Sequence, residues 1–573
     1  MTASDGADAG NRAVPSRSGG QVICEALLAE GIDVIFGMPG GASLPFYDVL
    51  YHYQDRLRHV LVRHEQGAGF AANGYARATG RVGVATSTSG PGATNLVTSI
   101  ANDHMDSVGV VYITGQVARP AIGSDAFQET DITGITIPIT KHNYLVMHAD
   151  ELPQVMAEAL HLARSGRPGP VLVDVPKDVF LEETTVPVPE TVSVRGYSPA
   201  RAGNAKMVRR AADIINAADR PMIMAGHGVD ISGASTELFE LATGGGIPVV
   251  TTLHGVGTFP ETHPLSFGML GMHGLAYANF AMGETDCIIG LGVRFDDRAV
   301  GKVDEFGPNA KVIHVDIDPA EIGKVLSTDV PIVGDLKLTL QALLPLIKYH
   351  ERRPWIDQLE EWRSNHPSLD IPDSPNSVLP QEVVRAIYTA SGGDAHVVAD
   401  VGQNQMWASQ HFWYEEPRRF FSAGGLGPMG YALPAAMGVQ MGVPDTPVWC
   451  VTGDGGLLIN IQEFNTLAAE KIPVKVAILN NSHLGMIRQW QQFFYDGRYM
   501  GAFLDNPDFA KVAEAFGLRG ISVNTRDELQ SAVADAHAYD GPVVLDVHVD
   551  RVENVYPMIV PGTGVRSVIE DPR

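Results

Sequence analysis

Residues 451–464 read VTGDGGLLINIQEF, and residues 474–485 read VKVAILNNSHLG. Each run begins with the short apolar pattern of a buried strand and passes directly into a turn rich in Gly or Asn. Strands of this kind are typical of parallel sheets that helices cover on both faces. The two runs therefore predict an α/β fold with polar residues at the carboxyl ends of strands, where open α/β sheets bind their ligands.

Asp454 and Asn481 stand at these two strand ends. A Gly-Asp-Gly turn leaves backbone N–H groups open to a phosphate, and a carboxylate and an amide carbonyl are hard oxygen ligands for Mg²⁺. An Asp-Gly pair by itself is usually only a turn. Because this one is paired with Asn480 and Asn481 after a second strand, we predict a clamp that holds a diphosphate through Mg²⁺.

The same alternation continues along the chain of 573 residues, which at about 150 residues per domain is long enough for three or four domains. Two stretches without this alternation, rich in Pro or in charged residues, indicate linkers. We therefore expect three consecutive doubly wound α/β domains. The expected boundaries are a disordered tail at 1–19, a first domain at 20–185, a linker at 186–204, a second domain at 205–349, a linker at 350–377, a third domain at 378–550 and a C-terminal lid segment at 551–573.

Charge and composition exclude several classes of function. The 66 acidic residues outnumber the 41 Lys and Arg residues, and the net charge of -25 repels nucleic acids and anionic lipid surfaces. No apolar run approaches the roughly 20 residues of a membrane span, and the first 20 residues lack the apolar segment of a signal peptide, so we expect a cytoplasmic protein. Cys24, Cys287 and Cys450 are far apart, and the apolar runs around Cys287 and Cys450 predict buried thiols.

The spacing of 27 residues between Asp454 and Asn481 resembles the thiamine diphosphate (ThDP) motif of ThDP-dependent decarboxylases and carboligases. The resemblance implies that Asp454, Asn481 and the main-chain oxygen of His483 bind Mg²⁺. It also implies a carboxylate in the first domain, which RHEQGAGFAANGYARATG at 63–80 supplies as Glu65. A carboxylate there would hydrogen-bond the pyrimidine ring of the cofactor and favour the tautomer that deprotonates the thiazolium ring. The alternative is an ordinary Glu at a helix N-terminus.

Longer runs extend the resemblance to one family. Over roughly residues 20 to 565 the chain is similar to the catalytic (large) subunits of acetohydroxyacid synthases, also called acetolactate synthases. The runs that carry this similarity are TSTSGPGATNLVTSIANDHMDS at 86–107, GSDAFQETDITGITIPITKHNYLV at 123–146, SGRPGPVLVDVPKDV at 165–179, GMLGMHG at 268–274, GVRFDDR at 292–298, ADVGQNQMW at 399–407, GGLGPMGYALPAAMG at 424–438 and GMIRQWQQFFY at 485–495.

The family resemblance implies a pyrimidine-binding domain, a central FAD-binding domain and a diphosphate-binding domain. It places the active site between two subunits, with Glu65 from one and Asp454 and Asn481 from the other. A homodimer is then the smallest catalytic unit, with a tetramer as the alternative, and a small regulatory subunit is a further expected partner.

The resemblance also assigns the residues around ThDP. Met429, a bulky apolar residue, would lie beneath the cofactor and enforce its bent shape. Asn404 stands where the family usually has His and keeps a hydrogen-bonding side chain. The expected ThDP contacts are Glu65, Val401, Gln403, Asn404, Gly427, Met429, Gly453, Asp454, Gly455, Gly456, Asn481, His483, Gly485 and Met486.

Five further residues match the family's substrate side: Phe127, Gln128, Lys177, Arg298 and Trp490. Arg298 can offer a bidentate fork to the carboxylate of the acceptor, and its alternative is a buried ion pair with a neighbouring Asp. Trp490 would offer apolar surface to 2-oxobutanoate, whose extra methylene is worth about 1 to 3 kcal/mol, and its alternative is a core position. Single residues of the other types usually serve packing or solvation.

The resemblance implies that FAD binds mainly to the second domain. Gly226 and Gly228 supply only part of a dinucleotide fingerprint, so the Rossmann motif alone is weak. The expected FAD contacts are Arg167, Gly226, His227, Gly228, Thr252, Leu253, Leu270, Gly271, Met272, His273, Gly292, Val293, Arg294, Asp296, Arg298, Asp316, Ile317 and Asp335. Because the implied net reaction is not a redox reaction, FAD would be structural and would stabilise the fold.

The implied reaction is the decarboxylation of pyruvate and the joining of the two-carbon unit to a second pyruvate or to 2-oxobutanoate, the first common step of valine, leucine and isoleucine biosynthesis. The alternatives are another ThDP carboligase, such as glyoxylate carboligase, a flavin-dependent pyruvate oxidase, a flavin-free acetolactate synthase and a non-catalytic scaffold. Glyoxylate carboligase has Val in place of Glu65, and a scaffold is expected to lack Glu65 or Asp454. Trp490 and the run at 268–274 favour the synthase over the flavin-free enzyme.

Overall fold

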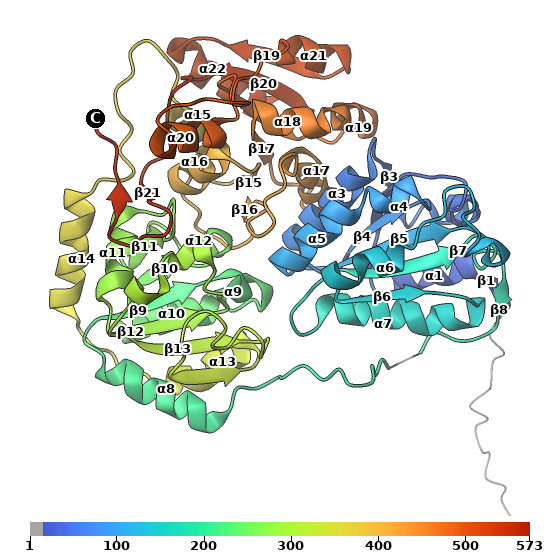
Figure 1. The fold of residues 1–573 in the computed structure, drawn as a ribbon, viewed down its shortest axis with the longest axis horizontal. Coiled ribbons are helices and arrows are strands. Elements are labelled where there is room, and N and C mark those ends of the chain that lie inside the picture. The colour runs from blue at the N-terminus through green and yellow to red at the C-terminus, as the bar shows by residue number, and fades with distance from the viewer. Residues whose placement is uncertain (1–14, 190) are drawn as a thin grey trace, which may run out of the picture.

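The computed structural model describes residues 15–189 and 191–573 and contains three parallel sheets of six strands each. Each sheet lies inside one of the three expected blocks of sequence, and helices cover both of its faces (Figure 1). The prediction of three consecutive α/β domains is therefore confirmed.

In the first domain the strands follow the order β3-β2-β4-β5-β7-β6. Helices α1 (Gly19–Ala29) and α7 (Leu152–Arg164) pack against one face of this sheet, and α3 (Glu65–Thr79) and α5 (Val97–Asp106) pack against the other. Every strand pair in the sheet is parallel. The strands are β2 (Val34–Gly37), β3 (Arg58–Leu61), β4 (Gly83–Ser87), β5 (Val110–Gln116), β6 (His142–Leu145) and β7 (Val171–Pro176).

The second domain has the strand order β11-β10-β9-β12-β13-β14. One apolar cluster joins its sheet to α8 (Ala205–Ala217), α10 (Ser235–Gly245) and α13 (Leu336–Leu343), and a second cluster joins it to α11 (Ala276–Glu284) and α14 (Arg353–Asn365). The strands are β9 (Pro221–Ala225), β10 (Val249–Thr251), β11 (Ser266–Met269), β12 (Cys287–Leu291), β13 (Lys311–Asp316) and β14 (Val330–Val333).

The third domain has the strand order β16-β15-β17-β18-β20-β19. Helices α15 (Pro380–Ser391), α16 (Gln403–His411) and α22 (Arg526–Ala538) cover one face, and α17 (Ala432–Gly442), α19 (Phe464–Glu470) and α21 (Phe509–Ala515) cover the other. The strands are β15 (His396–Ala399), β16 (Phe420–Phe421), β17 (Val448–Gly453), β18 (Lys475–Asn480), β19 (Arg519–Val523) and β20 (Val543–His548).

Helices α3 and α17 join the first domain to the third, side by side (Figure 1). A Cβ atom at Gly438 would collide with the carbonyl oxygen of Ala71, so only glycine allows the two backbones to approach this closely. One continuous apolar cluster runs from α3 through α17 into β17 and β18. Tyr431 adds a buried hydrogen bond of 2.7 Å from its hydroxyl to Asn73. The first and third domains therefore share a hydrophobic core.

The expected disordered tail ends earlier than predicted. Its residues 1–14 lie outside the described part of the chain. Arg17–Ser18 forms β1, which pairs with β8 (Glu183–Thr184), and α1 begins at Gly19 with Ser18 and Gln21 as a capping box. Because Ser18 and Gln21 satisfy the free N–H groups of the helix start, the ordered domain extends back into the segment expected to be a tail.

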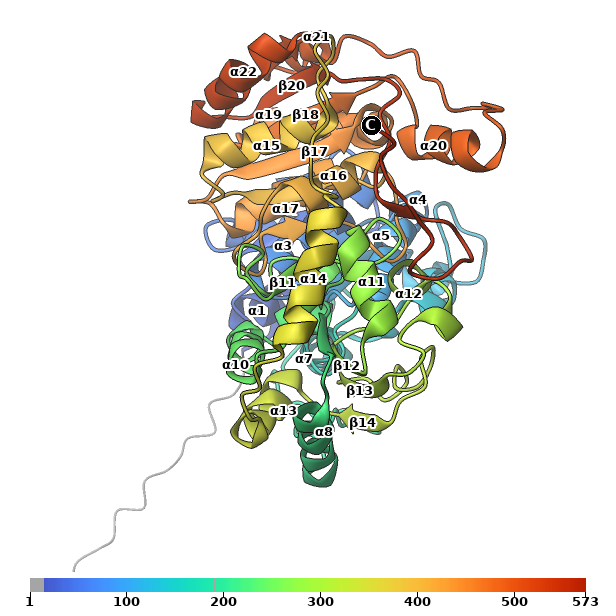
Figure 2. The ribbon, with the colours of Figure 1, turned by 90° about the vertical axis from the view of Figure 1, so that its left-hand side faces the viewer.

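The segment 350–377 is not simply a linker, because α14 occupies much of it. Trp355 and Leu359, spaced i and i+4, are buried against the central sheet, while Asp357 between them is exposed. Figure 2 shows α14 beside α11 on the outside of the molecule. The other expected linker has neither helix nor strand in its described residues, at 186–189 and 191–204. The C-terminal segment contacts the second domain through the N–H of Ile559 and the carbonyl of Met272, at 2.8 Å.

The three cysteines are buried and free, which confirms the prediction of buried thiols at Cys287 and Cys450. Burial raises the pKa of Cys24 and of Cys287 to about 12, because the charged thiolate loses its hydration. Their thiols therefore belong to the packed cores. Across the described ranges, no helix combines the length and the apolar character that a membrane crossing requires.

Candidate active site

The predicted metal ligands lie at the carboxyl ends of β17 and β18. These strands are neighbours, with Gly453 opposite Leu479, so Asp454 and the Asn480-Asn481 pair leave the sheet at the same edge. The Asp454 carboxylate is 1% exposed and accepts hydrogen bonds from the N–H of Gly455 at 2.9 Å and from the Asn506 amide at 2.7 Å. The structure thus brings the two predicted halves of the clamp together.

Burial raises the pKa of Asp454 to about 6, because a carboxylate is poorly hydrated there. The hydrogen bonds from Asn506 and Gly455 oppose that shift. A divalent cation would favour the charged carboxylate further. Asp454 is therefore a buried carboxyl group whose burial its own domain offsets only in part.

Asn481 lies at the same sheet edge as Asp454, and neighbouring residues hold its side chain in place. Its side-chain oxygen accepts the N–H of His483 at 3.0 Å, and its amide donates to the Gln403 side chain at 3.4 Å. A Cβ atom at Gly485 would collide with the side-chain oxygen of Gln403, so a larger residue there would displace the Gln403 side chain. The carboxylate of Asp454, the amide oxygen of Asn481 and the backbone oxygens of this turn are the hard donors that Mg²⁺ prefers.

Other predicted ThDP contacts lie near the Gly-Asp-Gly turn at 453–455. Met429 approaches Gly455, since its Cε lies 3.6 Å from a Cβ placed there, and Gly427 has a left-handed φ of 70° next to Val401. Asn404 donates from its amide to the carbonyl oxygens of Asp400 at 2.8 Å and Val451 at 3.2 Å. Its amide hydrogens therefore tie β15 to β17, which leaves its oxygen as the group near the Gly-Asp-Gly turn.

Two residues at this edge were missed by the sequence analysis. Asp400 is buried directly after β15 and accepts N–H groups from Val401, Gly430 and Ala432. Its place after an apolar strand is the same signal that singled out Asp454. Asn506 donates to Asp454 and to the Asn480 side chain at 3.0 Å, and its own oxygen is buried without a partner in the described structure. No spacing in the sequence connects it to them.

Glu65 occupies the corresponding edge of the first domain. It begins α3, is 8% exposed and accepts a hydrogen bond of 2.9 Å from the Asn95 amide. Gly92 lies next to it, because a Cβ there would come within 3.3 Å of the other carboxylate oxygen. The Gly-Pro-Gly turn also touches Gln128, whose backbone lies 2.8 Å from a Cβ placed on Gly90. The structure thus gathers Glu65 and Gln128 around one turn.

The segment after Asp454 meets the segment before Glu65 within this chain. Glu463 accepts the N–H groups of Arg63 at 2.9 Å and His64 at 3.1 Å. In the described residues, the hydrogen bonds of Glu65 stay in the first domain and those of Asp454 stay in the third.

The expected substrate residues lie on accessible surfaces. The Phe127 side chain is 88% exposed, and Lys177 is exposed directly after β7. Trp490 lies on α20 (Gly485–Phe494) in edge contact with Phe494 and keeps part of its surface accessible, so the alternative of a core position is wrong.

Arg298 keeps its charge accessible. Its side chain is 59% exposed and lies 3.8 Å from the carboxylate of Asp297, which is 84% exposed, so the alternative of a buried ion pair is wrong. Its Nη1 lies 3.1 Å from the sulfur of Met272, and its carbonyl oxygen accepts the Met272 N–H at 2.7 Å. Arg298 therefore belongs with the run at 268–274.

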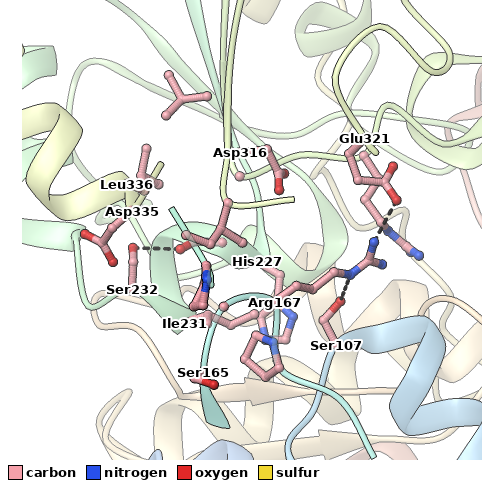
Figure 3. A pocket seen from close by; sticks show the side chains of 18 of the residues that line it. Ser107, Ser165, Arg167, His227, Ile231, Ser232, Asp316, Glu321, Asp335 and Leu336 are labelled. Atoms are coloured by element: carbon pink, nitrogen blue, oxygen red, sulfur yellow. Dashed lines mark hydrogen bonds and ion pairs between the residues drawn. The ribbon is translucent and has the colours of Figure 1, made fainter. Parts of the chain in front are cut away.

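A cavity of about 580 Å³ lies between the first domain, the linker and the second domain. Figure 3 shows Arg167, His227, Asp316 and Asp335 around it. The expected FAD contacts that line it are Arg167, His227, Gly228, Thr252, Gly292, Val293, Arg294, Asp296, Asp316, Ile317 and Asp335. Those that do not line it are Gly226, Leu253, Leu270, Gly271, Met272, His273 and Arg298.

Two glycine turns form one wall of this cavity. Gly228 follows β9 and Gly292 follows β12, and a Cβ on Gly228 would lie 2.6 Å from the Cα of Gly292. Gly292 also has a φ of 58°. Both positions therefore require glycine, and the wall exposes backbone rather than side chains to a ligand.

Charged side chains line another part of the cavity wall. Arg167 donates to Ser107 at 2.9 Å and to Glu321 at 2.7 Å (Figure 3). It also donates to Asp318 at 3.1 Å. Burial raises the pKa of Asp316 to about 6. The partners of Arg167 were missed by the sequence analysis, since nothing in the spacing pairs the first domain with these acids.

Linker residues also line the cavity, among them Tyr197 and Arg201. Lys141 holds Tyr197 in place by donating to its hydroxyl at 2.8 Å, and the same amine donates to the carbonyl oxygens of Leu162, Ser165 and Arg167. The linker was expected to be only a connection. The extended backbone of the linker instead forms part of the cavity wall.

Comparisons with known proteins agree with this architecture. Three family models match: the N-terminal TPP binding domain of thiamine pyrophosphate enzymes at residues 17–135, their central domain at 208–343 and their C-terminal TPP binding domain at 400–547. The chain is 48% identical to an acetolactate synthase of Mycobacterium bovis, over 98% of this chain and 94% of that protein. It is 48% identical to an acetolactate synthase of Arthrospira platensis, over 96% and 97%, and 47% identical to an acetolactate synthase large subunit of Corynebacterium glutamicum, over 97% and 91%.

Proposed function

The chain belongs to the acetolactate synthase large subunits, a family of thiamine pyrophosphate enzymes, and from that premise we propose that it decarboxylates pyruvate and joins the two-carbon unit to a second 2-keto acid. The acceptor is pyruvate, which gives 2-acetolactate, or 2-oxobutanoate, which gives 2-aceto-2-hydroxybutanoate. The observation that carries the proposal is the meeting of Asp454 and Asn481 at one sheet edge in a chain similar to these enzymes over nearly its whole length.

Thiamine diphosphate is the expected cofactor, and its thiazolium ring supplies the electron sink for loss of CO₂. The third domain would hold its diphosphate through Mg²⁺, with Asp454, Asn481 and the His483 carbonyl as protein ligands. The buried, unpartnered oxygen of Asn506 and the raised pKa of Asp454 support a cation at this place. Met429, beside Gly455, would support the ring system from below.

Glu65 would hydrogen-bond the pyrimidine ring and hold the proton at its carboxyl oxygen. Asn95 already engages one oxygen, which fixes the rotation of the carboxylate and leaves the other for the ring. Gly92 keeps the space beside that second oxygen open, because any side chain there would come close to it. The turn after β4 thus presents one oriented carboxylate oxygen.

Arg298 would bind the carboxylate of the acceptor keto acid through its guanidinium fork. The open side chain of Arg298 supports this role, because its charge is not consumed by a buried partner. Phe127, Gln128 and Lys177 would complete the substrate side, and Trp490 would contact the extra methyl group of 2-oxobutanoate.

FAD would occupy the cavity at the first and second domains as a structural cofactor. The volume of about 580 Å³ falls within the range of roughly 300 to 1,000 Å³ that is typical of small-molecule sites. Backbone from the two glycine turns can approach a dinucleotide closely, and Asp316 can accept hydrogen bonds from sugar hydroxyls.

We further propose a cytoplasmic enzyme of branched-chain amino acid biosynthesis that acts as a homodimer or tetramer. Glu65 of one subunit would then face Asp454 and Asn481 of the partner. A small regulatory subunit is a further proposed partner, because the relatives include proteins named as large subunits.

The purified enzyme with ThDP, Mg²⁺ and FAD, supplied with pyruvate and 2-oxobutanoate, tests the reaction. Identification of the products by mass spectrometry should show acetohydroxy acids and CO₂. Acetyl phosphate with hydrogen peroxide would instead establish the alternative of a flavin-dependent pyruvate oxidase. Products from glyoxylate alone would point to another carboligase.

A further inference from the structure

Asp174 is a buried carboxyl group that the proposed chemistry does not use. It lies in β7, is 1% exposed and accepts hydrogen bonds from the Thr114 hydroxyl at 2.7 Å and the Gln116 amide at 3.0 Å, both on the neighbouring strand β5. Burial raises the pKa of Asp174 to about 7. Its second oxygen can accept from Gln116 in either protonation state. A buried acid is costly for the fold, so its retention calls for a role.

Gln116 also forms hydrogen bonds with two other segments of the chain. Its amide donates a second hydrogen bond of 2.8 Å to the carbonyl of Thr130, and its side-chain oxygen accepts the N–H of Val117 at 2.9 Å. Its main-chain oxygen accepts the N–H of Lys177 at 2.9 Å. One residue therefore connects the end of β7, where Lys177 lies, to the loop that ends at Thr130.

That loop, residues 123–131, carries Phe127 and Gln128. The Glu129 side chain ties it internally by accepting the N–H groups of Gly123 and Ala126. Gln128 has a left-handed φ of 60°. The loop is therefore a compact unit, and the Thr130 carbonyl is where the Gln116 side chain joins it to the sheet.

We propose that Asp174 is a positioning residue that, through Gln116, fixes the Phe127–Gln128 loop relative to Lys177 and so sets the binding of the keto acid. The inference rests on the proposed function, in which these three residues face the substrate. The inference adds a buried hydrogen-bond network that does not contact the substrate but determines how Phe127, Gln128 and Lys177 are arranged.

The network requires an acceptor oxygen that faces the Gln116 amide. Asn in place of Asp174 preserves this bond, because its oxygen can accept from Gln116 while its N–H₂ group donates to the Thr114 hydroxyl. Leu in place of Asp174 removes the acceptor and leaves one N–H of the Gln116 amide buried without a partner. The Gln116 side chain then loses the contact that holds it toward Thr130, which releases the loop.

The test measures loop protection and kinetics in Asp174→Leu, Gln116→Leu and Thr114→Val of the full-length holoenzyme. Hydrogen exchange of residues 123–131 should accelerate about tenfold or more in the first two variants and change little in Thr114→Val, which keeps the bond to Gln116. Displacement of substrate groups by about 1 Å can cost 10²-fold, so kcat/KM for pyruvate should fall about 10 to 10²-fold in the first two variants, mainly through KM. The double variant Asp174→Leu with Gln116→Leu should be no worse than Gln116→Leu alone.

Asp103→Leu is the matched control. Asp103 is a fully buried acid of the same domain that accepts from Asn73 at 2.7 Å and from Tyr112 at 2.6 Å. Its replacement should lower the melting temperature comparably without a selective effect on loop exchange or KM. Equal effects on loop exchange and KM in Asp174→Leu and Asp103→Leu, or an unchanged loop in Asp174→Leu, would overturn the proposal. If the wild-type protein forms no acetohydroxy acid, the proposed function fails, and the exchange measurement still tests whether the network holds the loop.

Discussion

The Asn506 amide donates a hydrogen bond of 2.7 Å to the carboxylate of Asp454 and thereby orients the acid that follows β17. Removal of such a supporting contact typically costs 10 to 100-fold in metal affinity. We therefore expect Asn506→Ala to weaken Mg²⁺ binding at least tenfold, as measured by calorimetry in the presence of ThDP. Asn524→Ala is the control, because Asn524 is an exposed Asn of the same domain and should bind Mg²⁺ like the wild type.

Glu65→Gln should lower the turnover number by about 10² to 10⁴, because a neutral amide cannot hold the proton of the pyrimidine ring as a carboxylate does. Steady-state rates with pyruvate measure this loss, and ThDP affinity should stay within a few-fold of the wild type. Glu158→Gln, at another acid of the first domain, should keep normal rates. Near-normal turnover in Glu65→Gln would refute the assigned role.

Gly228→Ala should abolish most flavin binding, because its Cβ would lie 2.6 Å from the Cα of Gly292 and would force the two turns of the cavity wall apart. The ratio of bound flavin to protein, from the absorbance near 450 nm after gel filtration, measures this effect.

Gly244→Ala provides the contrast within the same domain. Gly244 lies in α10 with open space around its Cβ position, so Ala should keep the flavin and raise the unfolding free energy by about 0.5 to 1 kcal/mol. Equal flavin loss in both variants would argue against the cavity as the flavin site.

Trp490→Leu should reduce the preference for 2-oxobutanoate over pyruvate about 10 to 200-fold, the range that one methylene contact can supply. Competition between the two acceptors, with both products quantified, measures the ratio. Phe516→Leu, at an aromatic residue of the third domain away from α20, should leave the ratio unchanged. An unaltered ratio in Trp490→Leu would remove this residue from the acceptor site.

Ionisation of Asp174 should lower the free energy of unfolding as the pH rises. Its pKa is raised from 3.8 to about 7 in the folded protein, so the folded state binds a proton that the unfolded state has released between these values. The group's contribution is complete below about pH 4 and is lost by about pH 7, with a slope of up to about 1.4 kcal/mol per pH unit. Urea unfolding at pH 5, 6, 7 and 8 should give a shallower decline in Asp174→Asn than in the wild type. Parallel curves for the two proteins would contradict this linkage.

The sequence predicted most of the fold because its strands are short, apolar on both faces and followed by polar turns. It also predicted the clamp, since Asp454 and Asn481 leave adjacent strands and a local pattern was sufficient to find them. Helix α14 was missed because its charged face resembles a linker, although Trp355 and Leu359 mark its buried stripe.

The contacts that were missed join segments distant in sequence. Asn506 reaches back to Asp454, and Arg167 reaches forward to Glu321 in another domain. No local period encodes such a pair, because only the packing of whole domains brings its members together. The accessible setting of Arg298 likewise follows from the surroundings of its helix rather than from its neighbours in the sequence.

The core shared by α3 and α17 makes the two ends of the polypeptide dependent on each other for folding, although a whole domain separates them along the chain. The ribosome completes the first domain long before α17 is synthesised. The apolar face of α3 that packs against α17 therefore stays exposed to solvent during most of the remaining synthesis.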